Sequence, residues 1–154
     1  MTLRIEIPAF APNAPIPNEY TRDGANKSPR LEWYGAPLDT RSYALIVEDP
    51  DAPKGTFRHW AAYDISPDAS SLPEGAGSSE LDASIKMARN DFGDVRYDGP
   101  QPPRGHGTHH YHFRLFALDT PALDLPEDAD AQQVLAAAQQ HAIAQAETVG
   151  TFER

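Results

Sequence analysis

Hydrophobic residues occur in short runs up to residue 118, and this pattern predicts a series of short β-strands. Leu3, Ile5 and Ile7 alternate with polar residues, the two-residue period that is typical of a strand with one buried face. Further apolar runs predict strands at residues 31–34, 43–47, 57–65 and 111–118. The run at 43–47 is continuously apolar, which is typical of a central strand covered on both faces. The pattern therefore predicts a mainly β domain.

The pattern of hydrophobic positions changes at residue 130. Asp130 and Gln133 have the spacing of a capping box at the start of a helix. Apolar residues then recur with a helical period, at Val134, Leu135, Ala138, Ala142, Ile143 and Ala146. Gly150 is a typical helix stop. We therefore predict a C-terminal helix that is appended to the β domain and extends through Ala146.

Composition limits the function classes that are open to this chain. The 154 residues predict one domain with a sizeable core. A formal net charge of −10 disfavours nucleic acids and anionic membrane surfaces as partners. The absence of cysteine excludes disulfides and thiolate metal sites. No apolar run approaches the roughly 20 residues that span a bilayer, and the first residues carry charges where a signal peptide is apolar. We expect a cytoplasmic protein, and its oligomeric state, homodimer included, stays open.

Two proline-rich segments contain most of the candidate chemistry. Residues 49–53 read Asp-Pro-Asp-Ala-Pro, and residues 99–111 read Gly-Pro-Gln-Pro-Pro-Arg-Gly-His-Gly-Thr-His-His-Tyr. Proline locks the backbone angle φ, so loops of this kind are stiff and favour a preformed pocket. Four of the six histidines lie in or between the two segments, and a fifth, His112, follows directly after the second. The sequence therefore predicts a site that these segments form together.

Each candidate residue also has a plain structural interpretation. Asp49 and Asp51 either cap a strand end in an Asp-Pro turn or place two carboxylates in a pocket. His109 and Tyr111 share one face of an extended segment, and His110 lies on the other face. The apolar residues that follow on the Tyr111 face indicate that His109 and Tyr111 point inward, although a surface location for these histidines stays open.

Catalysis is the alternative to binding. Asp49, His59 and His109 are residue types that could hold a catalytic zinc ion, although the metal motif HExxH is absent. The sequence also has no GxSxG nucleophile motif, no phosphate loop and no dinucleotide-binding fingerprint. A His/Asp acid–base hydrolase, metal-assisted or not, is therefore the alternative to a binding protein.

At these residues the chain resembles the phosphatidylethanolamine-binding protein family, also called Raf kinase inhibitor-like proteins, and most of all its small bacterial branch. The matching segments are residues 28–33, 49–53, 59–60, 89–93, 97–100 and 102–111. The tail at 141–154 resembles the closing helix of the branch. The resemblance covers nearly the whole chain in order, and the two proline-rich motifs together are specific.

The resemblance implies a fold and a site. It implies one domain over residues 1–154, an antiparallel β-sandwich with a C-terminal helix, and a pocket at one end for a phosphate-like anion. The residues carried over to the ligand site are Asp49, Asp51, Ala52, Pro53, His59, Gly99, Pro100, Pro102, His109 and Tyr111. It also implies a cis Ala52–Pro53 bond. His110 departs from the family, because many relatives have arginine there.

The implied function is binding without catalysis and without a cofactor or metal. The ligand would be a phosphoethanolamine head group or a phosphorylated partner, and the family name adds a protein partner such as a kinase. In the corresponding mechanism His59, His109 and Tyr111 donate hydrogen bonds to the anion. Asp49 accepts from a histidine N–H and so determines which ring nitrogen carries the proton.

Overall fold

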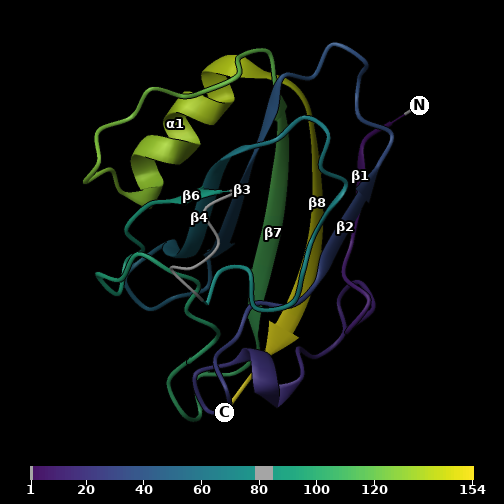
Figure 1. Ribbon diagram of the computed structural model, residues 1–154. Helices are drawn as coiled ribbons and strands as arrows, with labels where there is room; N and C mark the ends of the chain where they lie inside the picture. The colour runs from purple at the N-terminus through teal and green to yellow at the C-terminus, as the bar shows by residue number, and fades with distance from the viewer. Residues whose placement is uncertain (1, 79–84) are drawn as a thin grey trace.

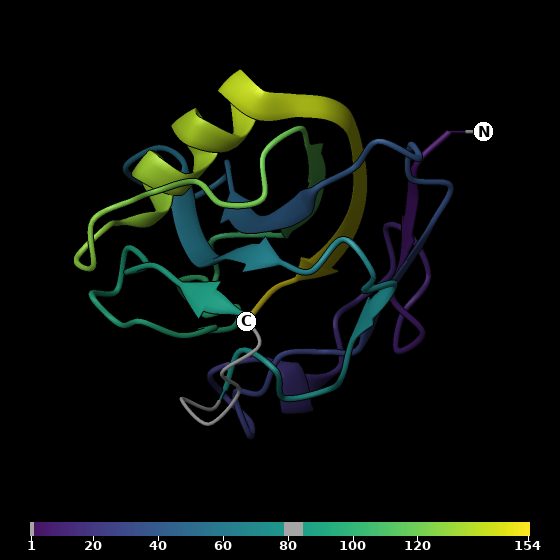
Figure 2. The same ribbon diagram turned by 45° about the horizontal axis from the view of Figure 1, so that its top comes forward.

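The computed structural model describes residues 2–78 and 85–154 (Figure 1). In this part of the chain, two antiparallel sheets and one α-helix form three layers (Figure 2). The larger sheet has the strand order β6-β4-β3-β7-β8, and the smaller has the order β1-β2-β5. The strands are Arg4–Glu6 (β1), Leu31–Tyr34 (β2), Ser42–Asp49 (β3), Phe57–Ile65 (β4), Ser71–Leu72 (β5), Lys86–Met87 (β6), His109–Leu118 (β7) and Ala142–Phe152 (β8). The predicted mainly β fold is confirmed.

The main core lies between the two sheets. Trp33 of the small sheet and Leu45, Trp60 and Phe113 of the large sheet belong to one buried cluster. Strand β3 pairs with β4 on one side and β7 on the other, and almost all of its residues are buried. Its apolar run therefore belongs to a central strand, as the sequence predicts.

The one α-helix of the described residues, α1 (Ala131–His141), covers the outer face of the large sheet. Val134 and Ala138 pack there against Ile46 and Phe116. The predicted capping box is present, because the Asp130 carboxylate accepts from the Gln133 N–H at 2.9 Å and the Gln133 side chain accepts from the Asp130 N–H. With 11 residues α1 is too short for a bilayer, and no helix of the described residues has the length and apolar character to cross one.

The predicted extent of the helix is wrong. The helix ends at His141, and residues 142–152 form β8 at one edge of the large sheet. β8 pairs with β7 along its whole length, from Leu118 opposite Ala142 to His109 opposite Phe152. These ladder hydrogen bonds and the β-branched residues near its end outweigh the helix propensity of its alanines. Gly150 is therefore no helix stop. A side chain there would collide with Ile16, because its Cβ would lie 2.6 Å from the Ile16 Cγ1.

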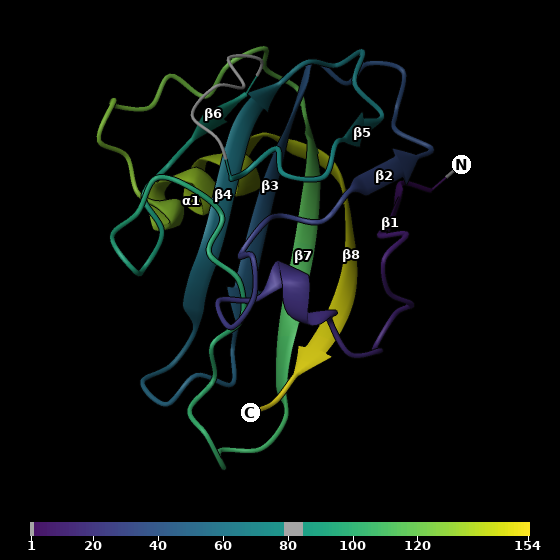
Figure 3. The same ribbon diagram turned by 60° about the horizontal axis from the view of Figure 1, so that its bottom comes forward.

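The two proline-rich segments lie at one end of the large sheet. The loop that leads into β7 runs beside the C-terminus, where the Gly105 N–H donates to the Arg154 carbonyl at 3.0 Å (Figure 3). The predicted cis Ala52–Pro53 bond is absent, because the described residues contain no cis peptide bond. The turn at 52–55 is instead closed by the Gly55 N–H, which donates to the Ala52 carbonyl. Gly55 takes a φ of 104°, which glycine adopts without strain.

Candidate ligand-binding site

A cavity of about 180 Å³ lies at the sheet end where β3 stops and β4 and β7 begin. Because the three strands are antiparallel neighbours, the last residue of β3 lies beside the first residues of the other two. Asp49 faces Phe57 in the β3–β4 ladder, and His109 starts β7. The cavity is lined by Asp49, Ala52, Pro53, Phe57, His59, Phe92, Gln101, Pro102, Pro103, His109 and Tyr111.

Seven of the ten predicted site residues therefore meet at one cavity, namely Asp49, Ala52, Pro53, His59, Pro102, His109 and Tyr111. Asp51, Gly99 and Pro100 do not line it. Asp51 is exposed and accepts from the backbone N–H of His110 at 2.8 Å. Gly99 packs against a backbone carbonyl, since a Cβ there would lie 2.0 Å from the Tyr20 oxygen. These positions hold the loops that surround the cavity.

Asp49 and His109 form a buried ion-pairing contact at the cavity. The His109 Nδ1 lies 2.6 Å from the Asp49 Oδ2, and both residues are 3% exposed or less. The second carboxylate oxygen, Oδ1, accepts from the Asp51 N–H at 2.8 Å. Nδ1 of His109 is therefore the donor in this pair, since the carboxylate only accepts. The predicted inward orientation of His109 and Tyr111 agrees with their burial.

His106 extends this pair toward the surface. The sequence predicts no role for this residue. Its Nδ1 lies 2.6 Å from the His109 Nε2, so that a carboxylate and two imidazoles form one hydrogen-bonded chain. His106 is exposed on a turn between Gly105 and Gly107, which both have positive φ. A ligand that binds the His109 Nε2 must therefore displace His106. Its position three residues before His109 was the available signal.

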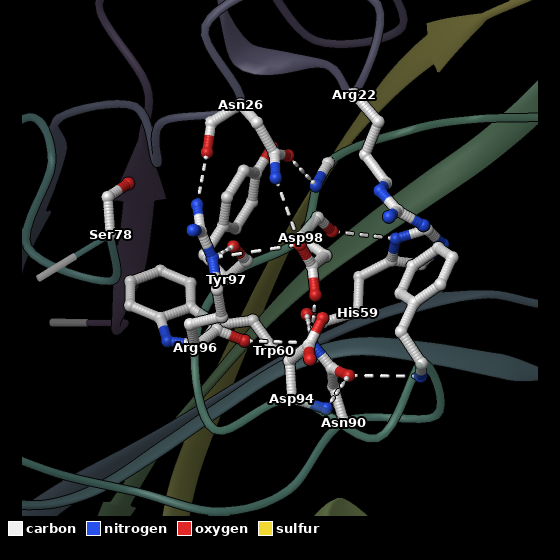
Figure 4. Close-up of polar contacts among 12 residues, drawn as sticks. Arg22, Asn26, His59, Trp60, Ser78, Asn90, Asp94, Arg96, Tyr97 and Asp98 are labelled. Atoms are coloured by element: carbon white, nitrogen blue, oxygen red, sulfur yellow. Dashed lines mark hydrogen bonds and ion pairs between the residues drawn. The ribbon is translucent and has the colours of Figure 1, made fainter.

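His59 is held by a contact with the backbone of Asp98 (Figure 4). Its Nδ1 lies 2.8 Å from the backbone carbonyl of Asp98, and the residue is 3% exposed. A carbonyl only accepts, so Nδ1 carries the proton. Burial lowers the pKa of His59 and outweighs the carbonyl contact and the Asp49 charge, which raise it. The lowered pKa favours the neutral ring, whose Nε2 bears a lone pair and accepts, in contrast to the expectation that His59 donates to an anion.

Asp98 is held in place by a network of polar side chains (Figure 4). Its carboxylate accepts from the Asn90 and Asn26 side chains, each at 2.9 Å. Burial raises the pKa of Asp98, but hydrogen bonds from Asp94, Asn90 and Asn26 outweigh it, and the net pKa is lowered. The Asp98 N–H also donates to the His59 carbonyl at 3.1 Å. The network thus fixes the backbone that orients the His59 ring.

Tyr111 contributes a protonated hydroxyl to the cavity. Burial raises the pKa of Tyr111 well above its ordinary value, and the nearby Asp49 carboxylate raises it further. The phenol therefore keeps its proton over the whole working range of pH and is available as a donor. Its ring meets the His59 ring edge to face, with centroids 5.3 Å apart.

Aromatic rings and one guanidinium form the remaining wall. The Phe57 and Phe92 rings pack edge to face with centroids 4.6 Å apart, and both also contact the His59 ring. Arg22 places its guanidinium 4.2 Å from the centre of the Phe92 ring and donates to the Gln101 side chain at 3.1 Å. Sequence reasoning missed Arg22 because it lies in the irregular segment 10–29, far along the chain from both proline-rich motifs.

A zinc site at Asp49, His59 and His109 finds no support in this geometry. Within residues 2–78 and 85–154, no group of three His, Cys, Asp or Glu side chains is arranged to hold a metal ion. Asp49 and His109 bind each other, and the His59 Nδ1 is bound to a carbonyl.

Comparisons with known proteins identify the family and the fold. A UPF0098 protein of Pyrococcus horikoshii is 43% identical over all of this chain and 78% of its own length. The crystal structure of YbcL from E. coli, described as a member of the mammalian PEBP family, superposes with a TM-score of 0.93 at 29% identity, over 100% of this chain and 99% of YbcL. CT736 of Chlamydia trachomatis gives a TM-score of 0.87 at 35% identity, over 99% and 98% of the two chains. The family model for phosphatidylethanolamine-binding protein matches residues 6–153, and the chain belongs to this family.

Proposed function

We propose that this chain is a non-enzymatic binding protein whose pocket takes a phosphate-like anion, such as the phosphoryl group of phosphoethanolamine. The observation that carries the proposal is the buried Asp49–His109 pair, which lines the same small cavity as Tyr111. Membership in a family named for ligand binding supports binding as the general role.

Tyr111 and His109 are the residues proposed to donate to an anion. The Tyr111 hydroxyl keeps its proton, and the His109 Nε2 donates when its ring carries two protons and His106 has moved away. The cavity of about 180 Å³ is smaller than the roughly 300–1,000 Å³ pockets that bury drug-sized ligands. Its size therefore suits a phosphoryl group or a compact head group.

Local donors can overcome the net charge of −10. A hydrogen bond to a charged group contributes about 1.5–3 kcal/mol net. Repulsion from exposed carboxylates is screened beyond about 8 Å at physiological salt. Arg22, at the wall formed by Phe92, adds a positive charge close to the cavity.

Titration calorimetry with phosphoethanolamine tests the proposal. Tyr111→Phe removes only the hydroxyl, and we expect its affinity to fall about tenfold, the equivalent of about 1.4 kcal/mol for one hydrogen bond to an anion. Tyr34→Phe is the matched control, because it removes an exposed tyrosine hydroxyl away from the cavity. Equal affinity in the wild type and Tyr111→Phe would place the ligand elsewhere.

One observation favours a second candidate, an acid–base hydrolase. The chain Asp49–His109–His106 has the carboxylate–imidazole contact that orients a general base. A panel of hydrolase substrates, with and without a chelator, tests it. Turnover that disappears in His109→Ala would establish the hydrolase, and no turnover on any substrate would favour the binding protein.

The predicted protein partner, such as a kinase, and the predicted cytoplasmic location are part of this proposal. A pull-down with the purified chain as bait, repeated with added phosphoethanolamine, tests whether a partner uses the pocket. Loss of the partner with phosphoethanolamine would indicate a phosphorylated group in the cavity, and an unchanged partner would indicate a different surface.

A further inference from the structure

The two polar walls of the cavity differ in what they offer a ligand. On one wall, the Tyr111 hydroxyl offers its hydrogen, and the His109 Nε2 offers a second one when its ring carries two protons and His106 has moved away. On the other wall, the neutral His59 ring offers the lone pair of its Nε2, because its single proton is held at Nδ1 by the Asp98 carbonyl. No described residue donates a hydrogen bond to this Nε2, although His59 lines the cavity.

A lone pair in a small cavity repels the oxygen of a fully deprotonated anion. An acceptor facing an acceptor is left unsatisfied, and an unsatisfied buried polar group costs binding free energy. The same lone pair binds an oxygen that carries a hydrogen. The ligand that satisfies both walls is therefore an anion with acceptor oxygens on one side and one O–H on the other.

We infer that the pocket selects phosphoryl groups that retain a P–O–H hydrogen, and that the His59 Nε2 accepts the hydrogen bond from this hydrogen. The inference rests on the proposed function. The ligand class is the monoanion of a phosphomonoester or of inorganic phosphate. Sulfate esters and phosphodiesters lack the hydrogen and are disfavoured. An intact phosphatidylethanolamine head group is a diester, so it belongs to the disfavoured class.

The surroundings of His59 keep its ring in the accepting state. Asp49 and Asp98 are the acidic groups that raise the pKa of His59, but the loss of water on burial has the larger effect. Phe57 and Phe92 cover the ring edge to face, with centroids 5.1 Å and 5.4 Å from it. Tyr111 on β7 has a raised pKa and stays neutral.

Methyl phosphate and methyl sulfate form a matched pair of probes. At a pH of about 5.5, below the phosphomonoester second pKa of about 6, both are mostly monoanions of the same shape that differ by one proton. Titration calorimetry is expected to show methyl phosphate binding roughly 10- to 100-fold more tightly, the range for losing one hydrogen bond and leaving its partner unpaired. Equal affinity, or tighter methyl sulfate binding, would overturn the inference.

His59→Asn tests the role of the ring directly. The asparagine amide N–H can still donate to the Asp98 carbonyl, but the atom in the place of Nε2 is gone. We expect the preference for methyl phosphate to fall to within about twofold. His110→Asn is the control, because His110 is exposed and does not line the cavity, and it should keep the full preference. If His59→Asn fails to fold in a thermal melt, the wild-type preference decides alone.

Three larger ligands identify the source of the phosphoryl group. Phosphoethanolamine and O-phosphoserine are monoesters that represent a lipid head group and a phosphorylated side chain, and both should bind more tightly than methyl sulfate. Glycerophosphoethanolamine, the diester, should bind roughly 10-fold more weakly than phosphoethanolamine. A diester that binds as tightly as the monoester overturns the inference.

The inference and the proposed function fail in different ways. If methyl phosphate and methyl sulfate bind equally and Tyr111→Phe weakens both, the anion pocket stands and proton selection is wrong. If none of the phosphate ligands binds, the proposed function is wrong and the inference falls with it.

Discussion

The two histidines of the cavity lie near the starts of β4 and β7, the strands on either side of β3, yet they have opposite chemistry. His109 binds the carboxylate of Asp49, and His59 binds the carbonyl of Asp98. In each ring Nδ1 makes this contact, and Nε2 is the nitrogen that would bind a ligand. The comparison teaches that the partner of one ring nitrogen and the degree of burial decide whether the other nitrogen donates or accepts.

The largest expected effect comes from removing the partner of His109. Asp49→Ala leaves a buried imidazole without its carboxylate, and breaking a buried pair on one side typically costs about 3–5 kcal/mol. We expect the free energy of unfolding in urea to fall by this order and phosphoethanolamine binding to be lost. Asp51→Ala is the control, because its pair with His110 is exposed and should contribute about 0–1 kcal/mol. Similar losses in both variants would remove the distinction between buried and exposed pairs.

The pH dependence of the free energy of unfolding tests the environment of His59. The folded state lowers the pKa of His59 below its ordinary value of about 6.5, so the unfolded state binds this proton more readily. Stability from this residue is therefore complete above the ordinary pKa and falls as the pH drops below it, by at most about 1.4 kcal/mol per pH unit. Urea denaturation at pH 7.5 and at pH 5.5 measures the change.

His59→Asn should have a flatter stability profile than the wild type over this range of pH. His112→Asn serves as the control. It removes a half-buried histidine on β7, on the face of that strand opposite to His109 and Tyr111. A wild type and His59→Asn with parallel profiles would show that His59 titrates alike in the folded and unfolded states.

The smallest expected effect concerns His106, which competes with a ligand for the His109 Nε2. His106→Ala removes the competitor, and phosphoethanolamine should bind more tightly by about 0.5–1.5 kcal/mol, the net value of one hydrogen bond. Calorimetry of His106→Ala and of His110→Ala, whose ring lies on the opposite strand face, measures the difference. Weaker binding in His106→Ala would make His106 a ligand contact instead of a competitor.

Much of the fold could be predicted from local patterns. The apolar runs located the main strands, and the Asp130–Gln133 spacing located the start of the helix. The end of the helix could not be found in this way, because the alanine-rich segment after His141 suits a helix and an edge strand about equally. Pairing with β7, which no local pattern contains, makes it a strand.

The sequence by itself determined which residue types could form a site and that two stiff proline segments would hold them. Tertiary structure decided which of them meet. Asp51, Gly99 and Pro100 support the loops, whereas Phe92 and Gln101 line the cavity. It also decided the protonation of His59. Burial and a carbonyl 39 residues away along the chain determine where its proton lies, and both exist only in the folded chain.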